Sequence, residues 1–162
     1  MTALTAITGA RIFDGDLWHE NSALLIDDGK VAAIVPRRGA PADARAVPMD
    51  GLSLVPGFVD LQVNGGGGVL LNEQPDLEGI RTICAAHARF GTTGLLPTLI
   101  TDNRAVTTQT ITAGLAAQKA AVPGFLGLHL EGPHLSVARK GAHDPARIRP
   151  MEDADLSRTI DA

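Results

Sequence analysis

The residues best suited to chemistry gather around Glu131. An apolar run, 126–130, leads into this glutamate just before a Gly-Pro turn, so its carboxylate is expected at the end of a buried strand. A charge in such a place is costly unless something pairs with it. A metal ion would pair with it, but backbone N–H groups, Arg139 or Lys140 are alternative partners.

Three histidines lie close to Glu131 in the sequence. His129 comes two residues earlier, so on a strand its side chain shares a face with Glu131. A core position is favoured for His129 over a ligand role. His143 lies in a loop expected to fold back over the strand ends, where it either contacts a substrate or faces solvent. For His134 both a site role and a surface position stay open.

Two segments of the chain must position these residues. Residues 1–55 contain short apolar runs, and the Asp28-Gly29 pair is typical of a β-hairpin. This segment is expected to be a small antiparallel β unit with a loop over 36–48. From residue 56 strands and helices alternate. Strands are expected over 58–64, 94–99 and 125–130, and helices over 77–90, from Asp102 or Asn103 to about Ala121, and from Met151 onward.

Three βα units in series predict a parallel sheet with right-handed crossovers. In such sheets the chemistry lies at the carboxyl ends of the strands. Polar residues occur at these places, namely Gln62, Asn64, Thr98, Thr101 and Glu131. Four glycines, 65–68, follow the first strand and form either a flexible loop or a close approach to a ligand. They lack the order of a phosphate-binding fingerprint.

Composition excludes several classes of protein. Apolar residues make up 44% of the chain and charged residues 20%, as in a globular protein. The net charge of −4 gives no support for nucleic-acid binding. A single cysteine, Cys84, cannot form an intramolecular disulfide, and no signal peptide, membrane-length apolar run or serine nucleophile motif is present. A weak basic cluster is compatible with a small anion or a solvated loop, and it consists of Arg139, Lys140, Arg147 and Arg149.

Four motifs follow one another along the chain. They are Pro-Gly-Phe-Val-Asp-Leu-Gln-Val-Asn-Gly at 56–65, Phe-Gly-Thr-Thr at 90–93 with Leu-Pro-Thr-Leu-Ile-Thr at 96–101, His-Leu-Glu-Gly-Pro at 129–133, and Lys-Gly-Ala-His at 140–143. Together they resemble the N-acetylglucosamine-6-phosphate deacetylase family of the amidohydrolase superfamily. The resemblance implies an α/β fold, an incomplete (β/α)₈ TIM barrel. Its first three βα units would occupy residues 56–162, preceded by part of a small β-sandwich over residues 1–55.

The resemblance also implies a reaction, which is hydrolysis of the N-acetyl group to give glucosamine 6-phosphate and acetate. Glu131 would be the carboxylate ligand of a divalent metal ion, with Zn²⁺ preferred and Fe²⁺ or another ion as the alternative. Ala142 and His143 would contact the sugar. Gln62 and Asn64 stand where many amidohydrolases have the His-x-His of a second metal. A one-metal site is therefore expected, with the two amides hydrogen-bonding around its water.

In the same family two histidine ligands and the general-base aspartate lie on later barrel strands, so no catalytic residue is expected within this chain. The chain is expected to be the inactive N-terminal part of a cytoplasmic enzyme. The complete enzyme would be a homodimer that takes a small amino-sugar phosphate, with no nucleic acid or membrane partner. Alternative interpretations are a non-catalytic remnant or assembly partner, and another amidohydrolase acting on a cyclic amide.

Overall fold

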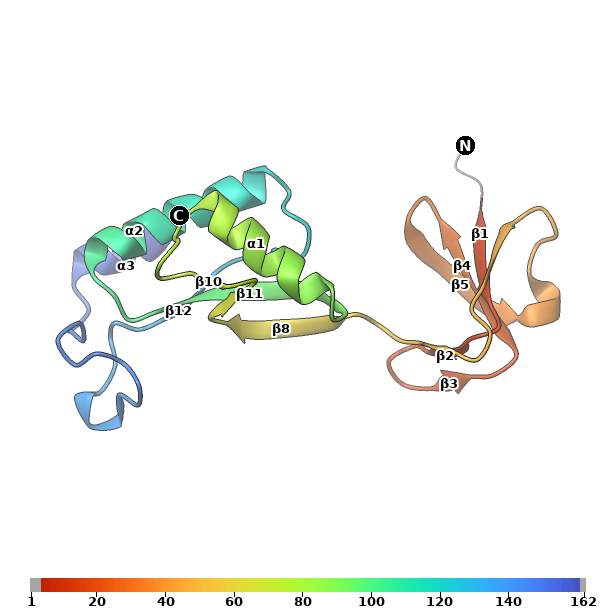
Figure 1. The fold of residues 1–162 in the computed structure, drawn as a ribbon, viewed down its shortest axis with the longest axis horizontal. Coiled ribbons are helices and arrows are strands. Elements are labelled where there is room, and N and C mark those ends of the chain that lie inside the picture. Colours follow the sequence, from red (N-terminus) through yellow and green to blue (C-terminus); the bar gives the residue numbers. More distant parts are fainter. Residues whose placement is uncertain (1–3, 161–162) are drawn as a thin grey trace. The chain divides into compact units, whose positions relative to one another are not determined.

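The computed structural model describes residues 4–160, which form two compact units divided between Pro56 and Gly57 (Figure 1). The first unit contains a four-stranded sheet in the order β5-β4-β1-β6 and a three-stranded sheet in the order β3-β2-β7. Its elements are β1 (Thr5–Thr8), β2 (Arg11–Phe13), β3 (Trp18–His19), β4 (Ser22–Asp27), β5 (Lys30–Pro36), the 3₁₀ turn η1 (Arg37–Gly39), β6 (Arg45–Pro48) and β7 (Ser53–Leu54).

The predicted hairpin between β4 and β5 is present. Asp27 pairs with Lys30, and the two residues between them, Asp28 and Gly29, both have positive φ angles, 46° and 73°. Two consecutive residues with positive φ match the right-handed twist of the flanking strands. The turn chemistry therefore sets the register of the pairs next to the turn, and an irregularity between Leu25 and Ile26 shifts the remaining pairs by one residue.

The expectation of a purely antiparallel first unit is wrong. β1 pairs in parallel with β6, and β2 pairs in parallel with β7. The segment 36–48, expected to be a loop, returns along the sheet and ends in strand β6. Pro48 lies in this strand, which a proline tolerates because β6 is at the edge of its sheet.

The second unit is built on a parallel sheet in the order β12-β11-β8. The predicted alternation of strands and helices is confirmed, and β11 lies in the middle. The elements are β8 (Phe58–Val63), β9 (Gly65–Gly66), β10 (Val69–Leu70), α1 (Leu77–Ala88), β11 (Thr92–Ile100), α2 (Arg104–Lys119), β12 (His129–Glu131), the 3₁₀ turn η2 (Val137–Arg139) and α3 (Asp153–Ile160).

Helices α1 and α2 lie along one face of this sheet (Figure 1). Each begins at a side chain that accepts a hydrogen bond from the first turn. Asp76 accepts from Gly79 N at 2.8 Å, and Asn103, not Asp102, accepts from Val106 N at 3.0 Å. The apolar faces of the helices close over the sheet in one core. Its buried residues are Val63, Leu71, Ile80, Ile83, Cys84, Leu95, Leu99, Ala113, Ala117 and Val122.

Two elements differ from the sequence-based expectation. The glycines after β8 form a hairpin, because β9 pairs with β10 and packs on α1. A Cβ atom on Gly66 would lie 2.9 Å from the His87 ring, so a glycine is needed for this close approach. The third strand of the sheet, β12, is shorter than predicted and joins β11 earlier only through a single bridge between Leu95 and Phe125. Between residues 4 and 160, no helix is long and apolar enough to cross a membrane.

Candidate functional site

Glu131 is the last residue of β12, where it lies beside Ile100 at the end of β11. Because the strands are parallel, their carboxyl ends meet at one edge of the sheet, which is the usual place for a ligand in such folds. The Glu131 side chain is 29% exposed. The carboxylate is thus half-buried at the edge where the sequence predicts the chemistry.

Gln62 reaches Glu131 from β8, two strands away. Its Nε2 donates to Glu131 Oε2 at 3.0 Å, across the central strand β11. The ladder between β8 and β11 is irregular just before this point, because Asp60 pairs with Leu95 while Val63 pairs with Pro97. One extra residue therefore bulges from β8, and Asp60 Oδ1 accepts the Gln62 N–H at 3.1 Å. The bulge fixes the backbone from which Gln62 extends.

His143 reaches Glu131 from the loop that follows β12. Its Nε2 lies 3.2 Å from Glu131 Oε1, and its Nδ1 lies 2.8 Å from Thr101 Oγ1. Thr101 N also donates to Nδ1 at 3.4 Å. A backbone N–H can only donate, so Nδ1 acts as an acceptor and the ring proton of neutral His143 is on Nε2. The imidazole then donates to the carboxylate, so both Glu131 oxygens have a hydrogen-bond donor.

The alternative ion pairs of Glu131 with Arg139 or Lys140 are absent from the described residues. Lys140 Nζ donates to the backbone carbonyls of Gly141 and His143 at 3.2 and 3.1 Å, and Arg139 is exposed. The weak basic cluster does not converge on one point either. Arg147 pairs with Asp144 and Arg149 with Asp155.

The remaining candidate residues lie outside these contacts. His129 Nδ1 is 3.3 Å from Thr98 Oγ1, a fully buried hydroxyl that also accepts the Val63 N–H at 2.9 Å. His129 itself is partly buried and contacts the interior through this hydroxyl. Asn64 forms no side-chain hydrogen bond in the described structure, and only its carbonyl accepts, from Leu71 N. Ala142 is exposed next to His143.

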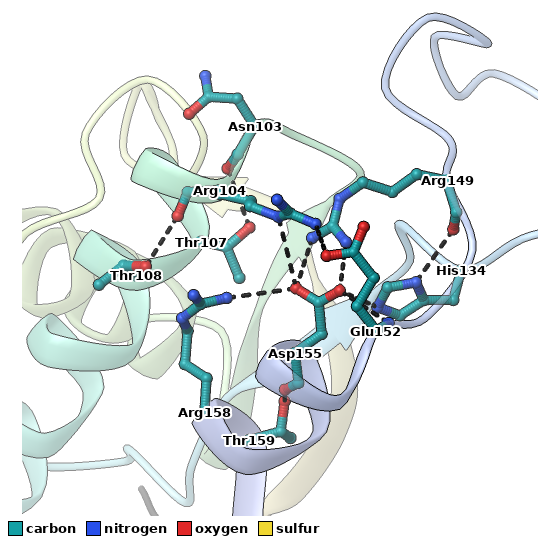
Figure 2. A network of polar contacts seen from close by, with 10 residues as sticks. All are labelled: Asn103, Arg104, Thr107, Thr108, His134, Arg149, Glu152, Asp155, Arg158 and Thr159. Atoms are coloured by element: carbon teal, nitrogen blue, oxygen red, sulfur yellow. Dashed lines mark hydrogen bonds and ion pairs between the residues drawn. The ribbon is translucent and has the colours of Figure 1, made fainter.

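Sequence reasoning missed two parts of this region. The sequence places Thr101 only as a polar residue at a strand end, yet in the structure its hydroxyl and N–H hold the His143 ring. The second part is a charged network around Asp155, which includes His134 (Figure 2). His134 Nδ1 donates to Arg149 O at 3.0 Å, so His134 faces this network instead of Glu131. No local motif marks either feature.

A metal ion would find one carboxylate ligand here. Among residues 4–160, no three His, Cys, Asp or Glu side chains form a group that could hold a metal ion. Glu131 keeps free lone pairs, and Gln62 donates to one of its oxygens in the way that outer partners orient a ligating carboxylate. The residues present therefore fit a metal site to which Glu131 provides one ligand.

Comparisons with known proteins give one consistent family. No family model matches the chain. It is 40% identical over 149 residues to the N-acetylgalactosamine-6-phosphate deacetylase of Shewanella sp. (strain ANA-3), covering 91% of this chain and 38% of that protein. It is 34% identical over 132 residues to the N-acetylglucosamine-6-phosphate deacetylase of Haemophilus influenzae, covering 80% of this chain and 34% of that protein.

A solved structure gives the same result. The crystal structure of N-acetylglucosamine-6-phosphate deacetylase from Pasteurella multocida superposes with a TM-score of 0.93 at 31% identity. The match covers 98% of this chain and 42% of that one. The chain therefore spans about two fifths of the length of the proteins that it matches.

Proposed function

We propose that the chain forms the N-terminal part of a metal-dependent amidohydrolase, because it belongs to the N-acetylglucosamine-6-phosphate deacetylase family. The complete enzyme would hydrolyse the N-acetyl group of an N-acetylhexosamine 6-phosphate, giving the amino-sugar phosphate and acetate. Relatives named for the glucosamine and the galactosamine compounds both match the chain. These relatives support the class of substrate and leave its C4 stereochemistry to experiment.

The observation that carries the proposal is the set of contacts around Glu131. Two segments converge on its carboxylate, since Gln62 on β8 contacts one oxygen and His143 in the loop after β12 contacts the other. A carboxylate held in this way at the carboxyl ends of parallel strands is suited to bind a divalent ion. We propose Glu131 as a metal ligand, with Zn²⁺ as the first choice and Fe²⁺ as the alternative.

The other residues of the site would act around this ligand. A bound divalent ion would supply Lewis acidity toward the acetyl carbonyl oxygen. Gln62 orients the Glu131 carboxylate through its 3.0 Å hydrogen bond. His143 and Ala142 would contact the sugar, with the His143 ring oriented by Thr101. Asn64 is the weaker candidate for a contact near the metal, because its side chain makes no hydrogen bond among the described residues.

Further ligands and a general-base aspartate would come from the length of the relatives that this chain does not span. A catalytic zinc site takes three protein ligands, and this chain contributes one. By itself the chain would then lack deacetylase activity. From the family resemblance we also propose a homodimeric, cytoplasmic complete enzyme.

The sheet of the second unit supports an incomplete barrel. Its outer strands β8 and β12 each have an unpaired edge in the described structure. On β8, Phe58, Val59 and Leu61 are between 61% and 64% exposed, which is unusual for apolar strand residues. An apolar groove of about 460 Å³ runs along α2 and includes Ile111 and Leu126. We therefore propose residues 56–162 as the first three βα units of a barrel, and residues 1–55 as part of a β-sandwich.

The test is acetate release by the metal-loaded complete enzyme from N-acetylglucosamine 6-phosphate and N-acetylgalactosamine 6-phosphate. Glu131→Gln should lower kcat/KM at least about 100-fold, because even outer partners of a ligand contribute 10–100-fold. Glu78→Gln, an exposed glutamate on α1, is the matched control and should leave the rate unchanged.

Three results would each contradict one part of the proposal. If the wild-type enzyme is inactive on both sugar phosphates, the proposed substrate class is excluded. Full activity and full metal content of Glu131→Gln would exclude Glu131 as a ligand. Turnover by the 162-residue chain alone would contradict the proposal that the chain is inactive without the remaining ligands.

A further inference from the structure

A buried carboxylate surrounded by cationic side chains lies at the start of α3. Asp155 is 5% exposed, and the Arg149 guanidinium donates to both of its oxygens, from Nη2 to Oδ1 at 2.8 Å and from Nη1 to Oδ2 (Figure 2). Arg158 Nη1 donates to Oδ1 at 3.3 Å, and Glu152 N donates to Oδ2 at 3.2 Å. A fork of two parallel hydrogen bonds fixes the orientation of Arg149 as well as its distance.

The same carboxylate also contacts α2. Arg104, the first residue of that helix, places Nε 3.7 Å from Asp155 Oδ1, and its Nη2 donates to Glu152 at 2.6 Å. Arg104 follows Thr101 by three residues. Asp155 therefore ties α3 to the segment that leaves β11 next to the Glu131 site.

Arg149 joins the two ends of the loop that carries His143. The neck of this loop is the junction of Pro133 and His134 with Arg149. The Arg149 N–H donates to Pro133 O at 3.1 Å, and its carbonyl accepts from His134 Nδ1 at 3.0 Å. The two ends of the loop are thus held together at one residue, and the side chain of that residue is held by Asp155. Figure 2 shows His134 and Arg149 side by side next to Asp155.

Inside the neck, one residue connects the loop to the sheet. His143 bonds to Thr101 and Glu131, while the other hydrogen bonds of residues 135–148 in the described structure stay within the loop. Most of this loop is exposed. The position of the imidazole therefore depends on its own bonds and on where the neck directs the loop.

We propose that Asp155 is a positioning residue, which holds His143 against Glu131 by fixing Arg149 and with it the neck of the loop. The geometric part of this proposal is independent of any activity. Its consequence for substrate binding rests on the proposed function, in which His143 contacts the sugar phosphate.

The test is the rate at which diethyl pyrocarbonate modifies His143 in the whole chain, followed by mass spectrometry of the peptides that contain His143 and His19. Asp155→Asn keeps the shape of the side chain and removes its charge. We expect His143 to react at least several-fold faster in this variant, because the ring leaves its two partners more often. His19, in the first unit, serves as the internal reference and should keep its rate. Glu152→Gln is the matched control, since it also contacts Arg104 but is exposed and does not hold Arg149.

An unchanged His143 rate in a folded Asp155→Asn chain would overturn the proposal, and so would an equal rise in Glu152→Gln. Circular dichroism establishes whether the variant is folded. If Asp155→Asn does not fold, Arg149→Lys decides instead, because lysine keeps the charge but loses the fork. A faster His143 reaction in Arg149→Lys supports the proposal, and an unchanged rate overturns it.

Kinetics of the metal-loaded complete enzyme separate this inference from the proposed function. A looser substrate contact should raise KM in Asp155→Asn several-fold more than it lowers kcat, with metal content unchanged. Wild-type enzyme without activity on either sugar phosphate would contradict the proposed function alone, because the modification rates would still decide whether Asp155 positions His143.

Discussion

Replacing Gly132 with alanine should disturb the site without removing any of its polar groups. Gly132 follows Glu131 directly and has a φ of 93°. A Cβ atom there would lie 2.1 Å from Thr101 Oγ1 and 3.3 Å from Leu135 Cδ1. The threonine hydroxyl is also 2.8 Å from His143 Nδ1. The collision would therefore fall on the group that holds the imidazole in place.

Gly141 provides the matched comparison. Its φ is 59°, and a Cβ atom there would meet nothing within 4 Å. In both positions an alanine must adopt a left-handed backbone, which costs about 1–2 kcal/mol. Overpacking adds about 1–3 kcal/mol at Gly132 only. The free energy of unfolding should thus fall by roughly 2–5 kcal/mol in Gly132→Ala and by roughly 1–2 kcal/mol in Gly141→Ala.

Urea unfolding followed by circular dichroism measures both losses, with equal m-values as the check that only stability has changed. The diethyl pyrocarbonate rate at His143, measured on the same samples, should rise in Gly132→Ala and stay unchanged in Gly141→Ala. Equal losses of stability in the two variants would refute the reasoning, because the backbone penalty would then explain the whole effect. An unchanged His143 rate in Gly132→Ala would refute the role of Thr101.

Three further predictions concern the interior and the ion pairs. Thr98→Val removes the acceptor of the buried Val63 N–H and should lower the free energy of unfolding by about 1–3 kcal/mol in urea, whereas Thr98→Ser should keep that hydrogen bond. Hydrogen bonds from Arg149 hold the pKa of the Asp155 carboxyl well below its usual range. The stability that the ionised carboxylate gives to the folded chain is therefore complete above the unfolded-state pKa of about 3.9 and is lost as pH falls through the folded-state pKa. The urea midpoint should therefore fall more steeply below about pH 4 in wild type than in Asp155→Asn. Burial raises the pKa of the Cys84 thiol, so an aromatic disulfide reagent should modify it far more slowly in the folded than in the urea-unfolded chain, and equal rates would contradict its place in the core.

Several parts of the fold follow from local signals in the sequence. The side chains of Asp76 and Asn103 begin α1 and α2, and the apolar spacing that follows them places one face of each helix on the sheet. The Asp28-Gly29 turn sets the β4–β5 pairing next to it. The proximity of Gln62 to Glu131 was also predictable in outline, because carboxyl ends of parallel strands meet at one edge.

Other parts depend on contacts that no local pattern encodes. The parallel pairing of β6 with β1 joins residues about 40 positions apart, and nothing in the segment 36–48 marks its end as a strand. Asn64 lies between β8 and β9, at the base of the β9–β10 hairpin, where its carbonyl accepts a hydrogen bond from Leu71 N. A strict alternation of side chains along β8 misplaces it for that reason.

The Asp155 network shows the same limit for charges. Arg104, Arg149 and Asp155 are spread over 52 positions, and each by itself resembles an ordinary solvated charge. Only the contact between Asp155 on α3 and Arg104 at the start of α2, together with Arg149, brings these charges together, and in the folded chain the carboxylate is buried. Burial of a charge is a property of the folded surroundings, so sequence patterns carry little information about it.

The closed neck of the His143 loop has a consequence for the entropy of binding. With its ends joined through Arg149 and Pro133, the stretch from Leu135 to Ile148 is a closed loop in the folded protein. Part of the conformational freedom of this stretch is lost during folding, so a ligand that contacts His143 has less of it to restrict. Loop-closure entropy grows slowly, by only about 0.6 kcal/mol for each doubling of length. Insertions at the exposed tip should therefore alter the shape of the site with little loss of stability, while the neck keeps the imidazole in place.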